Sequence, residues 1–322
     1  MFRIRCSGAA SATLLCLILG GNLAAQSAPP APGVTFAPYV DISKLTTGLA
    51  QVHASSGIKI FTLAFIVSGN GCVPAWGGTR PVATDAAMTA DIASLRQAGG
   101  DVIIAFGGYD GTDLGQACND GGSLQAAYQA VIDKYKAKCL DFDVEHTAIE
   151  DPVSIDRRSQ VLKALAAANP GLQINYTLPA TPAGLTDRSV SVIKSAVKYG
   201  TPVAVVNLMT MDYGKPVPLG AMGANAVGAA SGALCQLKSL GLNARVGITP
   251  MIGINDTPGE TFTLDDARVV VNYALANSNS IALLAFWSVG RDNGSCSPTV
   301  SPLCSGVSQK EWEFTRIFQK LQ

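Results

Sequence analysis

Short apolar runs alternate with longer stretches rich in Ala, Leu, Lys and Gln from residue 34 to the end of the chain. β-branched and apolar runs of this length predict strands, and the stretches between them have the pattern of helices. The predicted strands cover residues 34–40, 58–67, 101–106, 139–144, 173–178, 203–209, 245–251 and 281–287. The predicted helices cover residues 43–56, 84–98, 122–137, 153–168, 186–199, 224–240, 263–277 and 308–320.

Eight strands alternating with eight helices predict an α/β fold, a single (β/α)8 TIM barrel. The nearly continuous apolar strands agree with this fold, because both faces of such a sheet are buried. We expect no large inserted α+β domain, since residues 245–287 leave too little room for one. The alternative is a doubly wound open sheet, whose phosphate-binding fingerprint is Gly-x-Gly-x-x-Gly after the first strand. Residues 106–115 have a different glycine spacing and follow the third strand.

The N-terminal segment has the pattern of an export signal. A basic start at residues 1–5 precedes an apolar run at 9–20 and small residues up to Ala25. We therefore expect a signal peptide and leader over 1–28, a Pro-rich linker over 29–33 and a catalytic barrel over 34–322. An uncleaved anchor is the alternative reading. The mature protein is expected to be secreted, to the extracellular space or the periplasm, with no membrane attachment after the signal is removed.

Six cysteines remain after the signal, and an exported protein can pair them. Six cysteines allow fifteen pairings, among which the sequence alone does not choose. The two bridges that we expect join cysteines in neighbouring loops or within one loop: Cys72–Cys118 and Cys296–Cys304.

Charge and composition exclude several classes of function. The chain has 23 basic and 23 acidic residues, so it lacks the positive charge that nucleic-acid binding requires. It has two histidines and no Cys-x-x-Cys, so the usual zinc and iron–sulfur ligands are missing. We expect no cofactor, no metal, no nucleic-acid partner and a monomeric state.

Three carboxylates share one face of the fourth predicted strand. Asp141, Asp143 and Glu145 occupy alternate positions, and side chains on a strand repeat every second residue. The apolar residues between them would face the helices, so the acids would point into the barrel. Mutual repulsion and burial raise the pKa of at least one acid, which is what a general acid needs. A buried structural network or a cation site is the alternative.

This strand and three others resemble glycoside hydrolase family 18, the chitinases and their relatives. Residues 140–146 resemble its Asp-x-Asp-x-Glu motif, 104–108 its Ser-x-Gly-Gly motif and 209–213 its Met-x-Tyr-Asp motif. Trp287 ends the eighth strand, where the family has a tryptophan under the cleaved sugar. The resemblance implies hydrolysis of β-1,4-N-acetylglucosamine linkages in chitin or chito-oligosaccharides, with endo action favoured. Its substrate-assisted mechanism retains the configuration at the cleaved bond.

The resemblance also assigns roles to residues. Glu145 would be the acid and then the base, Asp143 would orient the substrate's N-acetyl group, and Asp141 would support Asp143. The predicted substrate-binding residues lie at strand ends: Gly107, Gly108, Tyr176, Met209, Asp212, Tyr213 and Trp287. Ala105 stands where a Ser is usual and Met211 where a Tyr is usual. A catalytically weak or inactive chitin- or glycan-binding lectin is therefore one alternative, and an endo-β-N-acetylglucosaminidase is another.

Overall fold

The computed structural model describes residues 33–296 and 298–321. The predicted signal peptide and most of the predicted linker lie outside these residues. No helix within them is long and apolar enough to cross a membrane.

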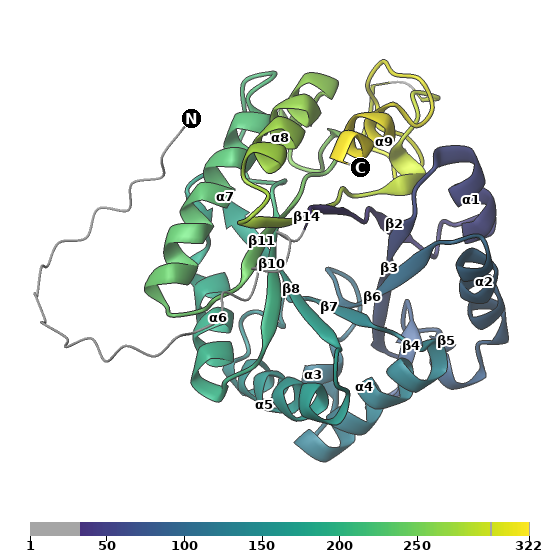
Figure 1. The fold of residues 1–322 in the computed structure, drawn as a ribbon, viewed down its shortest axis with the longest axis vertical. Coiled ribbons are helices and arrows are strands. Elements are labelled where there is room, and N and C mark those ends of the chain that lie inside the picture. The colour runs from purple at the N-terminus through teal and green to yellow at the C-terminus, as the bar shows by residue number, and fades with distance from the viewer. Residues whose placement is uncertain (1–32, 297, 322) are drawn as a thin grey trace, which may run out of the picture.

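Within the described chain, eight parallel strands close into a barrel (Figure 1). The first strand is interrupted at Ala37 and Pro38, so that its β1 half pairs with the last strand, β14, while its β2 half pairs with β3. This pairing joins the two ends of the sheet, whereas an open doubly wound sheet keeps two free edges. In chain order the barrel strands are β1 (Thr35–Phe36) with β2 (Tyr39–Asp41), β3 (Ile60–Ser68), β6 (Asp101–Gly107), β7 (Cys139–Asp143), β8 (Gln173–Thr181), β10 (Val203–Met209), β11 (Arg245–Thr249) and β14 (Ile281–Leu284).

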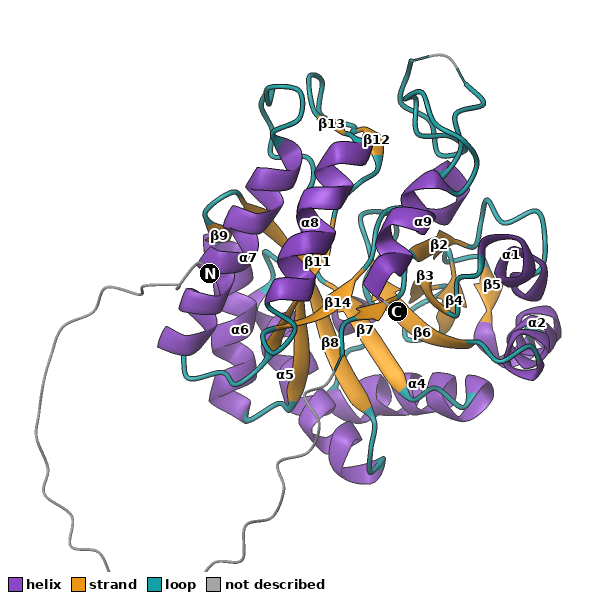
Figure 2. Cartoon of the chain, turned by 45° about the horizontal axis from the view of Figure 1, so that its top comes forward, coloured by secondary structure: helices purple, strands orange, loops and turns teal. Residues whose placement is uncertain are grey.

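Helices surround the barrel, as Figures 1 and 2 show. They are α1 (Leu49–Ser56), α2 (Ala86–Gln97), the short α3 (Leu114–Ala117), α4 (Gly121–Tyr135), α5 (Pro152–Ala168), α6 (Asp187–Tyr199), α7 (Met222–Ser239), α8 (Leu264–Ala276) and α9 (Glu313–Phe318). Short strands decorate the loops: β4 (Pro74–Trp76), β5 (Arg80–Pro81), β9 (Gly184–Leu185), β12 (Gly253–Ile254) and β13 (Thr261–Phe262). The connection from β11 to α8 is only the β12–β13 hairpin, so this part of the chain holds no inserted domain.

Along each barrel strand, successive side chains point alternately outward and inward, and the two sets pack differently. Side chains that point outward pack under the helices; Phe106 and Phe142, for example, stack with ring centroids 5.2 Å apart. Side chains that point inward form layers, and the lowest layer is apolar, with Ile103, Val205 and Leu283. Polar side chains occupy the layers above it. Catalytic groups of such barrels lie at the carboxyl ends of the strands, which is where this polar interior opens.

Element boundaries differ from the prediction at the two ends of the helix series. The helix expected from residue 43 begins at Leu49, because the Asp41 carboxylate accepts a hydrogen bond from the Ser43 N–H (2.9 Å) and holds a turn there. The helix expected from residue 308 begins at Glu313. The strand expected to reach Met251 ends at Thr249, since the next residue, Pro250, has no N–H for the ladder.

Both expected disulfides are present. Cys72–Cys118 joins the loop after β3 to the segment after α3, and Cys296–Cys304 closes a loop before α9. Each therefore fixes a connection beyond the carboxyl end of a barrel strand.

Candidate active site

The acidic residues lie on and just beyond β7, as the alternation predicts. Asp141 and Asp143 are 2% and 5% exposed, whereas the alternating residues Leu140 and Phe142 belong to the core under the helices. Glu145 lies two residues beyond the end of the strand and is half-buried. The three carboxyls therefore rise from the barrel interior to its mouth.

Asp141 is the deepest acid and is held by two hydroxyls. Its carboxylate accepts hydrogen bonds from the Tyr39 hydroxyl and from Thr177 Oγ1, each 2.8 Å long. Burial raises the pKa of Asp141 to about 6, and both hydrogen bonds oppose that rise. The support that a serine at position 105 would give is thus supplied from β2 and β8.

Asp143 is buried with no hydrogen-bond partner for its Oδ1 among the described residues. Burial, followed by the charges of Glu145 and Asp141, raises the pKa of Asp143 well above its usual value. An unpaired buried oxygen is costly, so it marks a group awaiting a partner from outside the chain.

Gly107 and Gly108 allow β6 to approach the Asp143 backbone. Both have positive φ angles, 90° and 86°, and a Cβ on Gly107 would lie 2.0 Å from the Asp143 carbonyl oxygen. The Gly108 N–H donates to that same oxygen at 3.1 Å. The observed role of this pair is to place Asp143, while the predicted contact with substrate stays a prediction.

Glu145 has the properties of a general acid. Burial raises its pKa to about 7, with smaller contributions from the negative charges of Asp110 and Asp212. A carboxyl with this pKa keeps a proton near neutral pH and can donate it to a leaving group. Next to it, the exposed rings of Tyr109 and His146 stack at 4.7 Å between centroids, forming part of the rim.

Asp212 and Tyr213 follow β10 and differ in accessibility. Asp212 has a φ of 48°, and its carboxylate accepts a hydrogen bond from the Thr257 N–H at 2.7 Å. Burial and the charge of Asp256 raise the pKa of Asp212. Tyr213 is partly buried against the core, and its hydroxyl is covered and near Glu260. Asp212 therefore remains the better-placed substrate contact of the two.

Trp287 lies across the barrel mouth from β7. The strand expected to end at Trp287 ends at Leu284, and Trp287 follows it with an isolated bridge to Met251. Its ring stacks on Phe65 at 5.7 Å, with 12° between the ring planes, and lies 6.1 Å from the Tyr39 ring. Met209 alternates with outward-facing Leu208, so it faces the interior at the end of β10. Trp287 thus has an aromatic support that can hold a sugar face.

The prediction that Tyr176 binds substrate is wrong. Tyr176 is 0% exposed and belongs to the core between β8 and the helices, 6.2 Å from Phe142 between ring centroids. Its neighbours Asn175 and Thr177 are the inward-facing residues of that strand, as their hydrogen bonds to Cys139 and Asp141 show.

Sequence reasoning missed an interior network under the acids. Asn207 Nδ2 donates to Thr177 Oγ1 at 3.0 Å and to the Tyr39 hydroxyl at 3.3 Å. Thr249 Oγ1 donates to Asn207 Oδ1 at 2.9 Å. The available signal was the presence of polar residues, such as Asn207 and Thr177, at inward positions of these otherwise apolar strands.

The described residues contain no group of three or more His, Cys, Asp or Glu side chains arranged to hold a metal ion.

Comparisons with known proteins agree with this geometry. No family model matches the chain. It is 35% identical over 311 residues to a probable bifunctional chitinase/lysozyme of Escherichia coli and 35% identical over 280 residues to endochitinase 11 of Metarhizium anisopliae. These matches cover 89% and 81% of this chain, but only 34% and 53% of the relatives' lengths.

The match to a solved structure covers nearly the whole of the related chain. The catalytic domain of a hyperthermophilic chitinase from Pyrococcus furiosus has a TM-score of 0.80 and 36% identity. The match covers 91% of this chain and 96% of that domain. With the acidic motif on β7 and this near-complete correspondence, the chain belongs to glycoside hydrolase family 18, the chitinase family.

Proposed function

We propose that this protein hydrolyses β-1,4 linkages between N-acetylglucosamine units in chitin or chito-oligosaccharides. The observation that carries the proposal is Glu145, a half-buried carboxyl with a pKa raised to about 7 at the mouth of the barrel. Unpartnered Asp143 lies beneath it, and an aromatic floor at Trp287 lies across the mouth. The named activities of the relatives, a chitinase/lysozyme and an endochitinase, support an endo-acting enzyme.

Glu145 and Asp143 have different roles in the reaction. Glu145 donates its proton to the glycosidic oxygen, and the bond from that oxygen to the anomeric carbon breaks. The carbonyl oxygen of the substrate's N-acetyl group forms a bond to the same carbon, giving an oxazolinium ion. Asp143 faces the N-acetyl N–H and balances the positive charge. Glu145, now ionised, accepts a proton from water as the water oxygen attacks the anomeric carbon from the original side. The bond between that carbon and the N-acetyl oxygen breaks, which regenerates the neutral N-acetyl group and retains the configuration.

The protein is further proposed to act outside the cytoplasm as a secreted monomer. Support comes from the N-terminal signal pattern and from the two disulfides, which persist in oxidising compartments. The final destination, extracellular or periplasmic, would follow from fractionation of the producing cells.

Turnover of a chromogenic chito-oligosaccharide by the wild type and by Glu145→Gln tests the proposal. Loss of a general acid predicts a fall in kcat/KM of at least roughly 10²-fold. Glu150→Gln, an exposed acid five residues further on, is the matched control and should keep activity within about twofold. Equal turnover by wild type and Glu145→Gln would remove Glu145 from its role. Binding without turnover by the wild type would identify a lectin.

A further inference from the structure

A cavity of about 380 Å³ lies outside the barrel, between α1 and the segment that precedes α9. None of the three active-site acids lines it. Its lining includes the buried residues Val40 and Ser288, which follow Tyr39 and Trp287 in the sequence. α1 and α9 are adjacent around the ring in Figure 1. The volume lies within the range of sites that bind small molecules.

Trp312 supplies an aromatic wall in an unusual backbone conformation. Its φ is 60°, which is rare for a bulky residue, and its side chain is half-buried on the cavity wall. The conformation is imposed by Asp292. The Asp292 carbonyl accepts from the Trp312 N–H at 2.9 Å, and its carboxylate accepts from the first N–H groups of α9, those of Phe314 and Thr315, at 3.0 and 2.8 Å. Strain of this kind persists where function or packing requires it.

The rest of the lining is mixed, with apolar side chains such as Val40, Leu45 and Val52 beside polar ones. The polar lining residues include Thr46, Thr47, Lys44, Gln51 and Glu311. Within the described residues, the latter three form no side-chain hydrogen bond or ion pair. Lys44 is the one cationic residue among the described residues of a lining that also contains Asp41, Asp292 and Glu311, so the cavity does not select an anion. An aromatic face among free hydroxyl, amide and charged groups suits a neutral ligand with many hydroxyls, which is a sugar ring.

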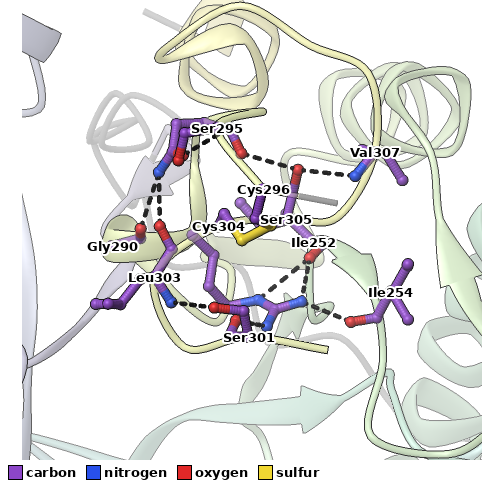
Figure 3. Close-up of a disulfide and its surroundings, with 12 residues drawn as sticks. Ile252, Ile254, Gly290, Ser295, Cys296, Ser301, Leu303, Cys304, Ser305 and Val307 are labelled. Carbon is purple, nitrogen blue, oxygen red and sulfur yellow. Dashed lines mark hydrogen bonds between the residues drawn. A yellow bond between two sulfur atoms is a disulfide. The ribbon is translucent and has the colours of Figure 1, made fainter. Parts of the chain in front are cut away.

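The loop closed by Cys296–Cys304 contributes Pro302 to the lining, and Asn293 precedes that loop. Figure 3 shows the loop closed by Cys296–Cys304 beside the carbonyls of Ile252, Ile254 and Ser301. The Arg291 guanidinium donates to all three, at 2.9 Å to Ile252 and 2.6 Å to Ile254. Asn293, which lines the cavity, donates to the carbonyl of Leu303 at 2.9 Å. A wall fixed in this way binds a ligand without first having to become ordered.

We propose that this cavity is an accessory saccharide site that binds an N-acetylglucosamine unit of chitin away from the cleaved bond. The choice of sugar rests on the proposed function. Binding at two linked places raises the effective concentration of a polymer at the catalytic groove, whereas an oligosaccharide too short to reach the cavity gains nothing. The site should therefore matter for the polymer and not for short substrates.

The test combines Trp312→Ala with Glu145→Gln, which prevents turnover, and measures binding to colloidal chitin. The expected fall in affinity is about tenfold relative to Glu145→Gln alone, as for loss of a single aromatic contact. Leu275→Ala, an exposed apolar residue on α8 outside the cavity, is the matched control and should have no effect. In the Glu145-containing background, Trp312→Ala should slow chitin hydrolysis and leave hydrolysis of a short chromogenic substrate unchanged.

A second variant tests the same cavity in case Trp312→Ala does not fold. Lys44→Ala with Gln51→Ala changes only exposed side chains of the lining and should lower chitin binding in the same assay. Unchanged chitin binding in this double variant and in any folded Trp312 variant would overturn the accessory site. A wild type that hydrolyses neither substrate would instead refute the proposed function, so the two failures are distinguishable.

Discussion

Glu145→Gln should make the protein more stable at high pH, although it removes the proposed catalytic acid. The pKa of Glu145 rises from 4.5 in the unfolded chain to about 7 in the folded protein. Since each pKa unit corresponds to about 1.4 kcal/mol, ionised Glu145 lowers the free energy of unfolding by about 3 kcal/mol. The sign follows from proton binding: the folded state holds this proton more tightly. The loss of stability therefore develops as pH rises from about 4.5 to 7 and is complete above pH 8.

Thermal unfolding of the wild type and Glu145→Gln at pH 4 and pH 8.5 measures this effect. Glutamine has no ionised form, so the variant should match the wild type near pH 4 and melt roughly 5–10 °C higher at pH 8.5. Glu311→Gln changes an exposed glutamate and should show no pH-dependent difference. A Tm difference that is equal at both pH values, or that favours the wild type at pH 8.5, would show that Glu145 is not a desolvated carboxyl.

Three further predictions concern the surroundings of the acids. Gly107→Ala should lower stability by about 1–3 kcal/mol from the backbone alone and should also reduce kcat/KM, because its φ is 90° and its Cβ would meet the Asp143 carbonyl. An unchanged midpoint of unfolding in urea together with wild-type kcat/KM would contradict this. Tyr39→Phe removes the 2.8 Å hydrogen bond to Asp141 and should reduce stability by about 1 kcal/mol and lower kcat, and unchanged values in both assays would show that the hydroxyl is dispensable. Asp110→Asn removes a negative charge that raises the pKa of Glu145, so the basic limb of the kcat/KM profile should move to lower pH; an unmoved limb would place Asp110 too far away to act.

The fold could be predicted from the sequence because its strands are buried on both faces. Apolar runs bounded by helical patterns then suffice to locate the eight barrel strands in the described chain. The errors lie at element ends and at the break in the first strand at Ala37 and Pro38. The late start of α9 depends on Asp292, whose carboxylate caps the helix from more than 20 residues away in sequence. No local pattern around residue 308 carries that information.

The acidic strand and β8 show how far alternation alone can identify a site. The rule placed Asp141 and Asp143 inward correctly, and it also indicates that Asn175 and Thr177 share one face of β8. Tyr176 was selected for its residue type against that rule, and it points into the core. The approach of Asp110 to Glu145 depends on the path of the loop after β6, which alternation does not describe.

The pH dependence of kcat/KM on a soluble chito-oligosaccharide tests the central claim most directly, because in the free enzyme its basic limb reports the essential acid. We predict a fall in kcat/KM centred near pH 7, where Glu145 loses its proton. A profile that stays flat to pH 9, or that already declines with a midpoint near the ordinary value of a solvated glutamate, would contradict it.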